Sequence, residues 1–122
     1  MAHQSDHWPL EIRLNKAENQ LEIDFEDGSC FALLSELLRV ESPSAEVQGH
    51  HPDDKKIVAG RRHVAILDIE AVGRYAIKIS FDDLHDTGIY SWDYLYRLGR
   101  DQTEIWQQYL TALEAQGLSR DP

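Results

Sequence analysis

Two stretches near the start of the chain alternate strictly between apolar and polar residues, and this pattern constrains the fold most. They cover residues 10–15 and 21–26, and Asp27-Gly28 follows the second stretch. A period of two is typical of strands that bury one face and expose the other. Asp-Gly between such segments indicates a hairpin, because a type I′ turn needs positive φ at both central positions. We therefore predict an antiparallel meander of three strands, with the third over residues 29–34.

The rest of the chain carries the patterns of two further strands and three helices. The strands are expected over residues 63–69 and 75–81. The helices are expected over residues 36–40, 91–98 and 101–117. Gly99 is expected to end the second helix, because glycine tolerates the left-handed conformation that follows many helices. These elements predict an α+β fold: an antiparallel sheet of about five strands with a short inserted helix and C-terminal helices packed on one face.

The length and charge of the chain limit its domain organisation and its partners. A chain of 122 residues predicts one domain over residues 1–122, with tails at 1–8 and 118–122, the latter frayed. The net charge of −10 argues against nucleic acid and anionic membrane surfaces, because both require clustered cations. No apolar run reaches the length of a membrane span, and the first residues lack the apolar segment of a signal peptide. We therefore expect a cytoplasmic protein that binds neither nucleic acid nor membranes.

The segment after residues 75–81 gathers four groups that bind metals or transfer protons: Asp82, Asp83, His85 and Asp86. Carboxylates and imidazole suit Zn, Fe, Ni or Mn, so one interpretation is a metal site. The other interpretation is a polar corner in which the Asp side chains accept hydrogen bonds from turn amides and cap the following helix. Neighbours in sequence cannot all point at one ion, so the residues alone favour the polar corner.

Signals for an enzyme are weak. The single cysteine, Cys30, excludes an internal disulfide, and nothing near it in sequence supplies the base and orienting group that a nucleophile needs. The Walker A, G-x-G-x-x-G, H-E-x-x-H and G-x-S-x-G patterns do not occur. We therefore expect a protein that is not an enzyme.

Several motifs in order resemble those of a known family. The motifs are Asp27-Gly28, Leu37-Leu38-Arg39 followed by residues 42–46, residues 72–76 and residues 82–92. Together they resemble the small bacterial proteins classed as DUF971, a family similar to the N-terminal domain of γ-butyrobetaine hydroxylase. The resemblance covers residues 9–99, which we take as the family-like core, and leaves residues 100–117 as an additional C-terminal helix.

The resemblance implies an accessory domain rather than a hydroxylase. In the hydroxylase, this domain holds a structural zinc through three Cys and one His, and the catalytic iron lies in a separate, larger domain. The chain of 122 residues leaves no room for that catalytic domain. His85 matches the zinc-binding His, whereas the segment matching the cysteines, residues 41–47, contains no Cys. Because thiolates supply most of the affinity for zinc, we expect no tight zinc binding.

Two roles for His85 remain open at this point. One is a hydrogen-bonded corner in which His85 packs near Glu41 or Glu46. The other is a weak Zn or Fe site formed by His85 with Asp83 or Asp86 and with Glu41 or Glu46. A related domain also lies at the C-terminus of a plastid P-loop NTPase that carries iron–sulfur clusters. The resemblance thus implies a binding or adaptor module with a protein partner, linked to iron–sulfur or other metalloprotein maturation.

Overall fold

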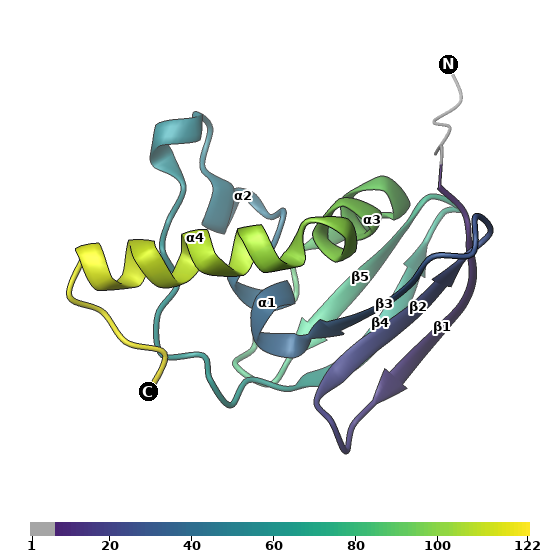
Figure 1. The fold of residues 1–122 in the computed structure, drawn as a ribbon, viewed down its shortest axis with the longest axis horizontal. Coiled ribbons are helices and arrows are strands. Elements are labelled where there is room, and N and C mark those ends of the chain that lie inside the picture. Colours follow the sequence, from purple (N-terminus) through teal and green to yellow (C-terminus); the bar gives the residue numbers. More distant parts are fainter. Residues whose placement is uncertain (1–6) are drawn as a thin grey trace.

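Two antiparallel sheets form the framework of the fold in the computed structural model, which describes residues 7–122. Residues 1–6 of the predicted N-terminal tail lie outside the described residues. The first sheet contains, in spatial order, β1 (Pro9–Asn15), β2 (Gln20–Phe25) and β3 (Cys30–Leu34). The second sheet contains, in spatial order, β4 (Ile66–Val72), β5 (Ala76–Phe81) and β6 (Ile89–Ser91). Figure 1 shows the two sheets and the helices around them.

The prediction of an α+β fold is confirmed, but the prediction of one sheet of about five strands is wrong. The described residues form two sheets of three strands each. β6 escaped prediction because Ile89–Ser91 is too short to show alternation and leads directly into a helix. The sheets stay separate because each has one apolar face, and residues from both faces share one core. When the apolar face of one sheet covers the apolar face of the other, both faces are removed from water. A single open sheet needs another layer to bury its apolar face.

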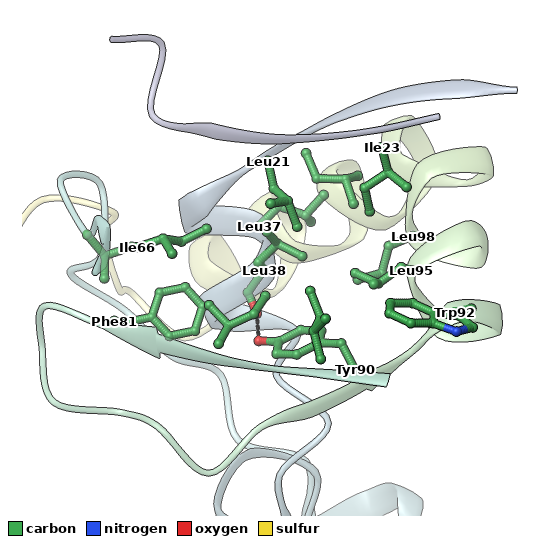
Figure 2. Packing of buried hydrophobic residues seen from close by; sticks show 14 of the residues in the cluster. Leu21, Ile23, Leu37, Leu38, Ile66, Phe81, Tyr90, Trp92, Leu95 and Leu98 are labelled. Carbon is green, nitrogen blue, oxygen red and sulfur yellow. Dashed lines mark hydrogen bonds between the residues drawn. The ribbon is translucent and has the colours of Figure 1, made fainter. Parts of the chain in front are cut away.

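The core lies between the apolar faces of the two sheets and is closed by helices. Figure 2 shows Leu21 and Ile23 of β2 on one side and Phe81 and Tyr90 of the second sheet on the other. The space between is filled by residues of the first and third helices, namely Leu37, Leu38, Trp92, Leu95 and Leu98. Full burial of such side chains stabilises the fold by about 1.5–3 kcal/mol each. The Tyr90 hydroxyl donates to the Leu38 carbonyl and so ties the second sheet to the first helix.

The helices are α1 (Ser35–Val40), α2 (Ala45–Gln48), the 3-10 helix η1 (Pro52–Asp54), α3 (Trp92–Arg100) and α4 (Gln102–Ala115). α4 contributes Tyr109 and Leu113 to a second apolar cluster, which also contains Val40 at the end of α1. Figure 1 shows α4 lying across α1 and the segment that follows it. Within residues 7–122, none of the helices has the length and apolar character needed to cross a membrane.

Gly99 does not end α3, contrary to the prediction, because the helix continues to Arg100. Instead, the glycine allows α3 to approach β3 closely. A Cβ atom at this position would lie 2.8 Å from Phe31 Cβ and still closer to the Phe31 ring. The missing side chain therefore sets the contact between the helix and the first sheet.

The C-terminal segment is attached to the fold rather than frayed. The Gly60 N–H donates to the Ser119 carbonyl (2.9 Å), and the Arg62 N–H donates to the Arg120 carbonyl (3.0 Å). The Arg120 guanidinium donates to both carboxylate oxygens of Glu36, at 2.9 and 2.7 Å. The contact between Glu36 and Arg120 joins residues 84 positions apart in the chain, which local sequence patterns cannot reveal.

Candidate functional site

The candidate site begins where β5 ends and the chain turns sharply. The Phe81 N–H donates to the His85 carbonyl (3.0 Å), and the Leu84 N–H donates to the Phe81 carbonyl (3.0 Å). Leu84 at the tip has a positive φ of 73° and is 86% exposed. The next side chain, His85, is only 8% exposed. The turn thus places an imidazole inside the protein beside α1 and the segment that follows α1.

Side chains from residues 42–46 enclose the His85 imidazole. Nε2 lies 2.8 Å from Ser42 Oγ and 3.4 Å from Ser44 Oγ. Nδ1 lies 3.5 Å from Glu46 Oε2. We refer to Ser42, Ser44, Glu46 and His85 as the His85 corner. The segment that the resemblance matches to zinc-binding cysteines therefore converges on His85 with two hydroxyls and one carboxylate.

Two residues that follow His85 hold the corner together from the other side. The Thr87 hydroxyl donates to Glu46 Oε1 (3.0 Å), which links this segment to α2. Gly88 lies against the serine: a Cβ atom there would be 2.5 Å from Ser42 Oγ and 3.0 Å from Tyr90 Cε1. Only glycine leaves room for Ser42 to reach the imidazole.

Asp83 binds two arginines rather than the imidazole. Its Oδ2 atom accepts a hydrogen bond of 2.7 Å from Nε of Arg39 and another of 2.7 Å from Nε of Arg61. Its Oδ1 atom accepts the His85 backbone N–H (3.1 Å). Burial alone would raise the pKa of Asp83, but the hydrogen bonds from Arg39, the His85 amide and Arg61, together with the charge of Arg39, lower it below the usual range. Asp83 is therefore an ionised counterion that fastens the turn to α1.

The environment of His85 favours its neutral form. Burial lowers the pKa of His85, and the Arg39 guanidinium lowers it further. The carboxylates of Glu46, Asp83 and Asp86 oppose this effect without overcoming it. A neutral imidazole carries one donor and one acceptor nitrogen, which matches a ring placed between hydroxyls and a carboxylate.

The structure brings together only some of the five predicted site residues. Glu46 and His85 are in contact. Asp83 lies in the same turn but faces Arg39 and Arg61. Glu41 is buried and accepts a hydrogen bond of 2.7 Å from Lys55 Nζ. Asp86 is exposed and influences His85 only through its charge.

These donors do not fit the tight zinc site of the hydroxylase domain. Within residues 7–122, no three His, Cys, Asp or Glu side chains lie close enough together to hold a metal ion. The imidazole nitrogen that faces the segment of residues 42–44 meets neutral hydroxyls, which are weak zinc ligands compared with thiolates. Glu46 contacts the opposite ring nitrogen, so it cannot share an ion bound at Nε2.

The order Ser42, His85, Glu46 is also that of a hydrolase triad, since a base lies between a hydroxyl and a carboxylate. The geometry alone would permit proton transfer from Ser42 Oγ to Nε2. Ser42, however, is 0% exposed, so its hydroxyl has no surface on which a substrate could meet it. In this conformation the arrangement stabilises the turn.

Sequence reasoning missed the residues that satisfy the corner. The sequence alone predicts no contact between His85 and the serines Ser42 and Ser44, and Arg39 enters only as part of the Leu37-Leu38-Arg39 motif. Arg39 is buried and holds Asp83, and its Nη1 atom is the buried side-chain nitrogen without a partner among the described residues. The signal available in the sequence was Arg39, which lies between the apolar residues Leu38 and Val40. An arginine that is buried with such neighbours requires a carboxylate as its partner.

The fold and the site define a small α+β domain with a buried histidine corner. The chain belongs to the family described as gamma-butyrobetaine hydroxylase-like, N-terminal, whose model matches residues 12–96. The predicted family is thereby confirmed. No curated protein gives a significant match to this chain.

Three solved structures are similar over most of the chain. One structure determined by NMR in solution has 46% identity and a TM-score of 0.83, and the match covers 100% of this chain and 92% of the chain in that structure. A second NMR structure has 43% identity, a TM-score of 0.82 and coverages of 95% and 91%. A crystal structure of a DUF971 protein of unknown function from Acidithiobacillus ferrooxidans has 41% identity, a TM-score of 0.64 and coverages of 75% and 91%. The first match includes α4, which lies beyond the family model.

Proposed function

We propose that the protein is a non-catalytic binding module that docks onto a protein partner. One observation carries this proposal: the reactive groups of the candidate site are satisfied inside the protein. Ser42 and His85 are buried against each other, and Asp83 is bound by two arginines. Groups arranged in this way stabilise a scaffold, and function then lies on the surface that the scaffold presents.

The charge of the chain favours a basic partner. On the outer face of the first sheet, the Arg13 guanidinium contacts three carboxylates, namely Glu11 at 2.9 Å, Glu22 at 3.3 Å and Asp24 at 2.8 Å. One cation among three anions leaves this face acidic, in keeping with the net charge of −10. Complementary charge chiefly speeds encounter and selects partners.

An apolar groove beside this sheet supports the same proposal. It encloses about 510 Å³ between β3, α1 and α4, and its lining includes Phe31, Leu34, Leu37 and Trp106. Leu34 is 44% exposed although it is apolar. A groove of this kind accepts an apolar anchor from a partner, and such anchors carry much of the energy of protein interfaces.

The nature of the partner is proposed from the family resemblance. Because a related domain accompanies a P-loop NTPase that carries iron–sulfur clusters, we propose that the partner is a metalloprotein or one of its assembly factors.

The test is capture of partners from cell extract by the protein at low and high salt, followed by titration with each purified candidate. A specific partner should bind more weakly at high salt, and Leu34→Glu should weaken binding. Leu84→Glu is the matched control, because Leu84 is exposed on the distant turn. No reproducible partner, or equal loss with both variants, would contradict the proposal.

A second candidate function is weak metal binding, and the contact between His85 and Glu46 favours it. One imidazole and one carboxylate hold a transition metal loosely, because water must complete the coordination. Addition of Zn²⁺ or Fe²⁺ to protein purified without an affinity tag would then shift the NMR signals of the His85 ring. Unchanged signals at millimolar metal would remove this candidate.

A further inference from the structure

A cavity between α4 and the segment that follows η1 is lined by an unusual share of the few cations in the chain. It encloses about 200 Å³. Its lining includes Lys55, Lys56 and Arg97, three of the 12 basic residues in a protein with a net charge of −10. Elsewhere the surface carries an excess of carboxylates, so this concentration of positive charge distinguishes the cavity.

The opposing carboxylate in the cavity is already neutralised. Glu41 is buried, and its Oε1 atom accepts a hydrogen bond of 2.7 Å from Lys55 Nζ. The other two cations are Lys56 and Arg97. Arg97 also acts through its charge on Asp101, whose carboxylate is hydrogen-bonded to Arg100. The Arg97 guanidinium lies 5.2 Å from the centroid of the Tyr94 ring. The cavity therefore has two positive groups in its lining besides Lys55.

The floor of the cavity is apolar. Ile105, Tyr109 and Ala112 lie on one face of α4, since their spacing of three and four residues matches the helical repeat. Val40 and Ile57 continue this surface from the segments opposite. An apolar floor with a few charged groups at the rim is the usual composition of a small-molecule site.

Hydrogen bonds fix the walls before any ligand arrives. The Lys56 N–H donates to the Val47 carbonyl (2.7 Å), and the Tyr109 hydroxyl donates to the Val58 carbonyl (2.6 Å). The Tyr94 hydroxyl donates to the Glu41 carbonyl. A site whose walls are already held in place binds with a smaller entropic cost than one that must first be ordered.

We propose that this cavity binds a small organic anion, with its carboxylate at Lys56 and Arg97 and its apolar body on Ile57, Ile105 and Tyr109. The volume admits a ligand smaller than a typical drug molecule. The net negative charge of the protein does not prevent binding, because at physiological ionic strength salt largely screens exposed charges that lie more than about 8 Å away. The lining of this cavity shares no residue with the His85 corner or with the groove at Leu34, so variants can change one site at a time.

The test is an NMR titration of the full chain with benzoate, which combines a carboxylate with a small apolar ring. We expect saturable shifts at Ile57, Arg97, Ile105 and Tyr109. Benzamide has the same shape without the charge and should bind at least tenfold more weakly. Sodium chloride at matched ionic strength should leave these signals in place. Shifts spread over the whole surface, or equal binding of benzamide, would overturn the proposal.

Variants of the two cations complete the test. Lys56→Gln and Arg97→Gln should each raise the benzoate Kd about three- to fivefold, the usual range for loss of one exposed ion pair. Arg97→Lys keeps the charge and should stay within about twofold of the original Kd. Lys16→Gln is the control, because it makes the same change in net charge on the groove between β1 and β4. Binding that is unchanged in the double variant Lys56→Gln/Arg97→Gln would overturn the proposal and leave partner docking unaffected.

Discussion

At the scale of single residues, the His85 corner depends on Asp83 as much as on the imidazole. The Arg39 side chain is 10% exposed, and Asp83 is the carboxylate that neutralises it. Asp83 also accepts hydrogen bonds from Arg61 and from the His85 amide. One carboxylate therefore joins α1, the segment before β4 and the turn after β5, and its removal should release all three.

We predict that Asp83→Asn lowers the free energy of unfolding by about 3–5 kcal/mol, because it leaves the buried charge of Arg39 without a counterion. Urea denaturation at pH 7 measures this change. Asp86→Asn is the matched control: Asp86 is exposed in the same turn, so the effect should stay within about 0.5 kcal/mol. Equal losses for the two variants would show that Asp83 has no special role.

The depressed pKa of His85 predicts the direction of a pH effect on stability. The unfolded chain has a histidine pKa of about 6.5, whereas burial and Arg39 lower the pKa in the folded state. As the pH falls from 7 to 5, the unfolded state therefore takes up the proton first. The free energy of unfolding should decrease, with a limit of about 1.4 kcal/mol per pH unit from this one group.

His85→Gln removes this titration and should give a flatter dependence of stability on pH between 7 and 5 than the original chain. Denaturant titrations at three pH values measure both curves. Asp83 does not contribute to the pH dependence in this range. Its pKa is lowered in the folded state, so its contribution to stability is lost only at much lower pH. Parallel curves for the two proteins would show that His85 is equally easy to protonate in the folded and unfolded states.

At the scale of elements, the contact between α3 and β3 depends on the space at Gly99. A methyl group there would clash with Phe31. The Phe31 ring cannot easily move away, because it packs against the rings of Phe25 and Tyr96, at centroid distances of 6.0 and 5.3 Å respectively. We predict that Gly99→Ala lowers the free energy of unfolding by about 1–3 kcal/mol through overpacking. Thermal or urea denaturation measures the loss.

A double-mutant cycle provides the control for Gly99. In a Phe31→Ala background the added methyl group has room, and alanine is the better helix former by about 1 kcal/mol. Gly99→Ala should then be neutral or stabilising. The same loss in both backgrounds would place its cause outside the contact between α3 and β3.

The C-terminal segment makes a second prediction at this scale. Glu36 is 4% exposed and accepts two hydrogen bonds from Arg120, so Arg120→Ala leaves a buried carboxylate unpaired. We predict a loss of about 2–3 kcal/mol in the free energy of unfolding. Arg62→Ala removes a neighbouring but exposed ion pair with Asp121 and should cost about 1 kcal/mol at most. A reversed order of the two losses would contradict the assignment.

The elements also show what the sequence could and could not predict. The strands of the first sheet follow from alternation, because burial of one face imposes a period of two on the sequence itself. β6 is too short to show alternation, and the attachment of residues 119 and 120 depends on hydrogen bonds to residues 60 and 62, for which the local sequence carries no signal. Gly99 was assigned to a helix end because the usual role of glycine after a helix outweighed close packing, which requires knowledge of β3.

The position of the candidate site in the chain could be predicted from the sequence, but the partners of its side chains could not. The resemblance placed residues 41–47 opposite His85, and the structure brings Ser42, Ser44 and Glu46 to the imidazole. It could not show that Asp83 and Glu41 are taken by cations, because Arg39, Arg61 and Lys55 come from separate segments. Competition for each carboxylate is settled only by the folded arrangement.

At the scale of the whole molecule, the part of the chain from residue 7 to residue 122 forms two small sheets and four α-helices around one core, with the buried His85 corner beside it. The acidic face of the first sheet and the groove at Leu34 lie on the outside, where a partner can reach them. We therefore assign stability to the His85 corner, and we propose that binding uses the surface. The central claim is that hydrogen bonds, rather than a metal ion, close the corner.

Elemental analysis of protein purified without an affinity tag tests this claim most directly, with His85→Gln measured beside it. We predict a metal content far below one ion per chain, with no difference between the two proteins. One tightly held metal ion per chain that disappears in His85→Gln would contradict the claim.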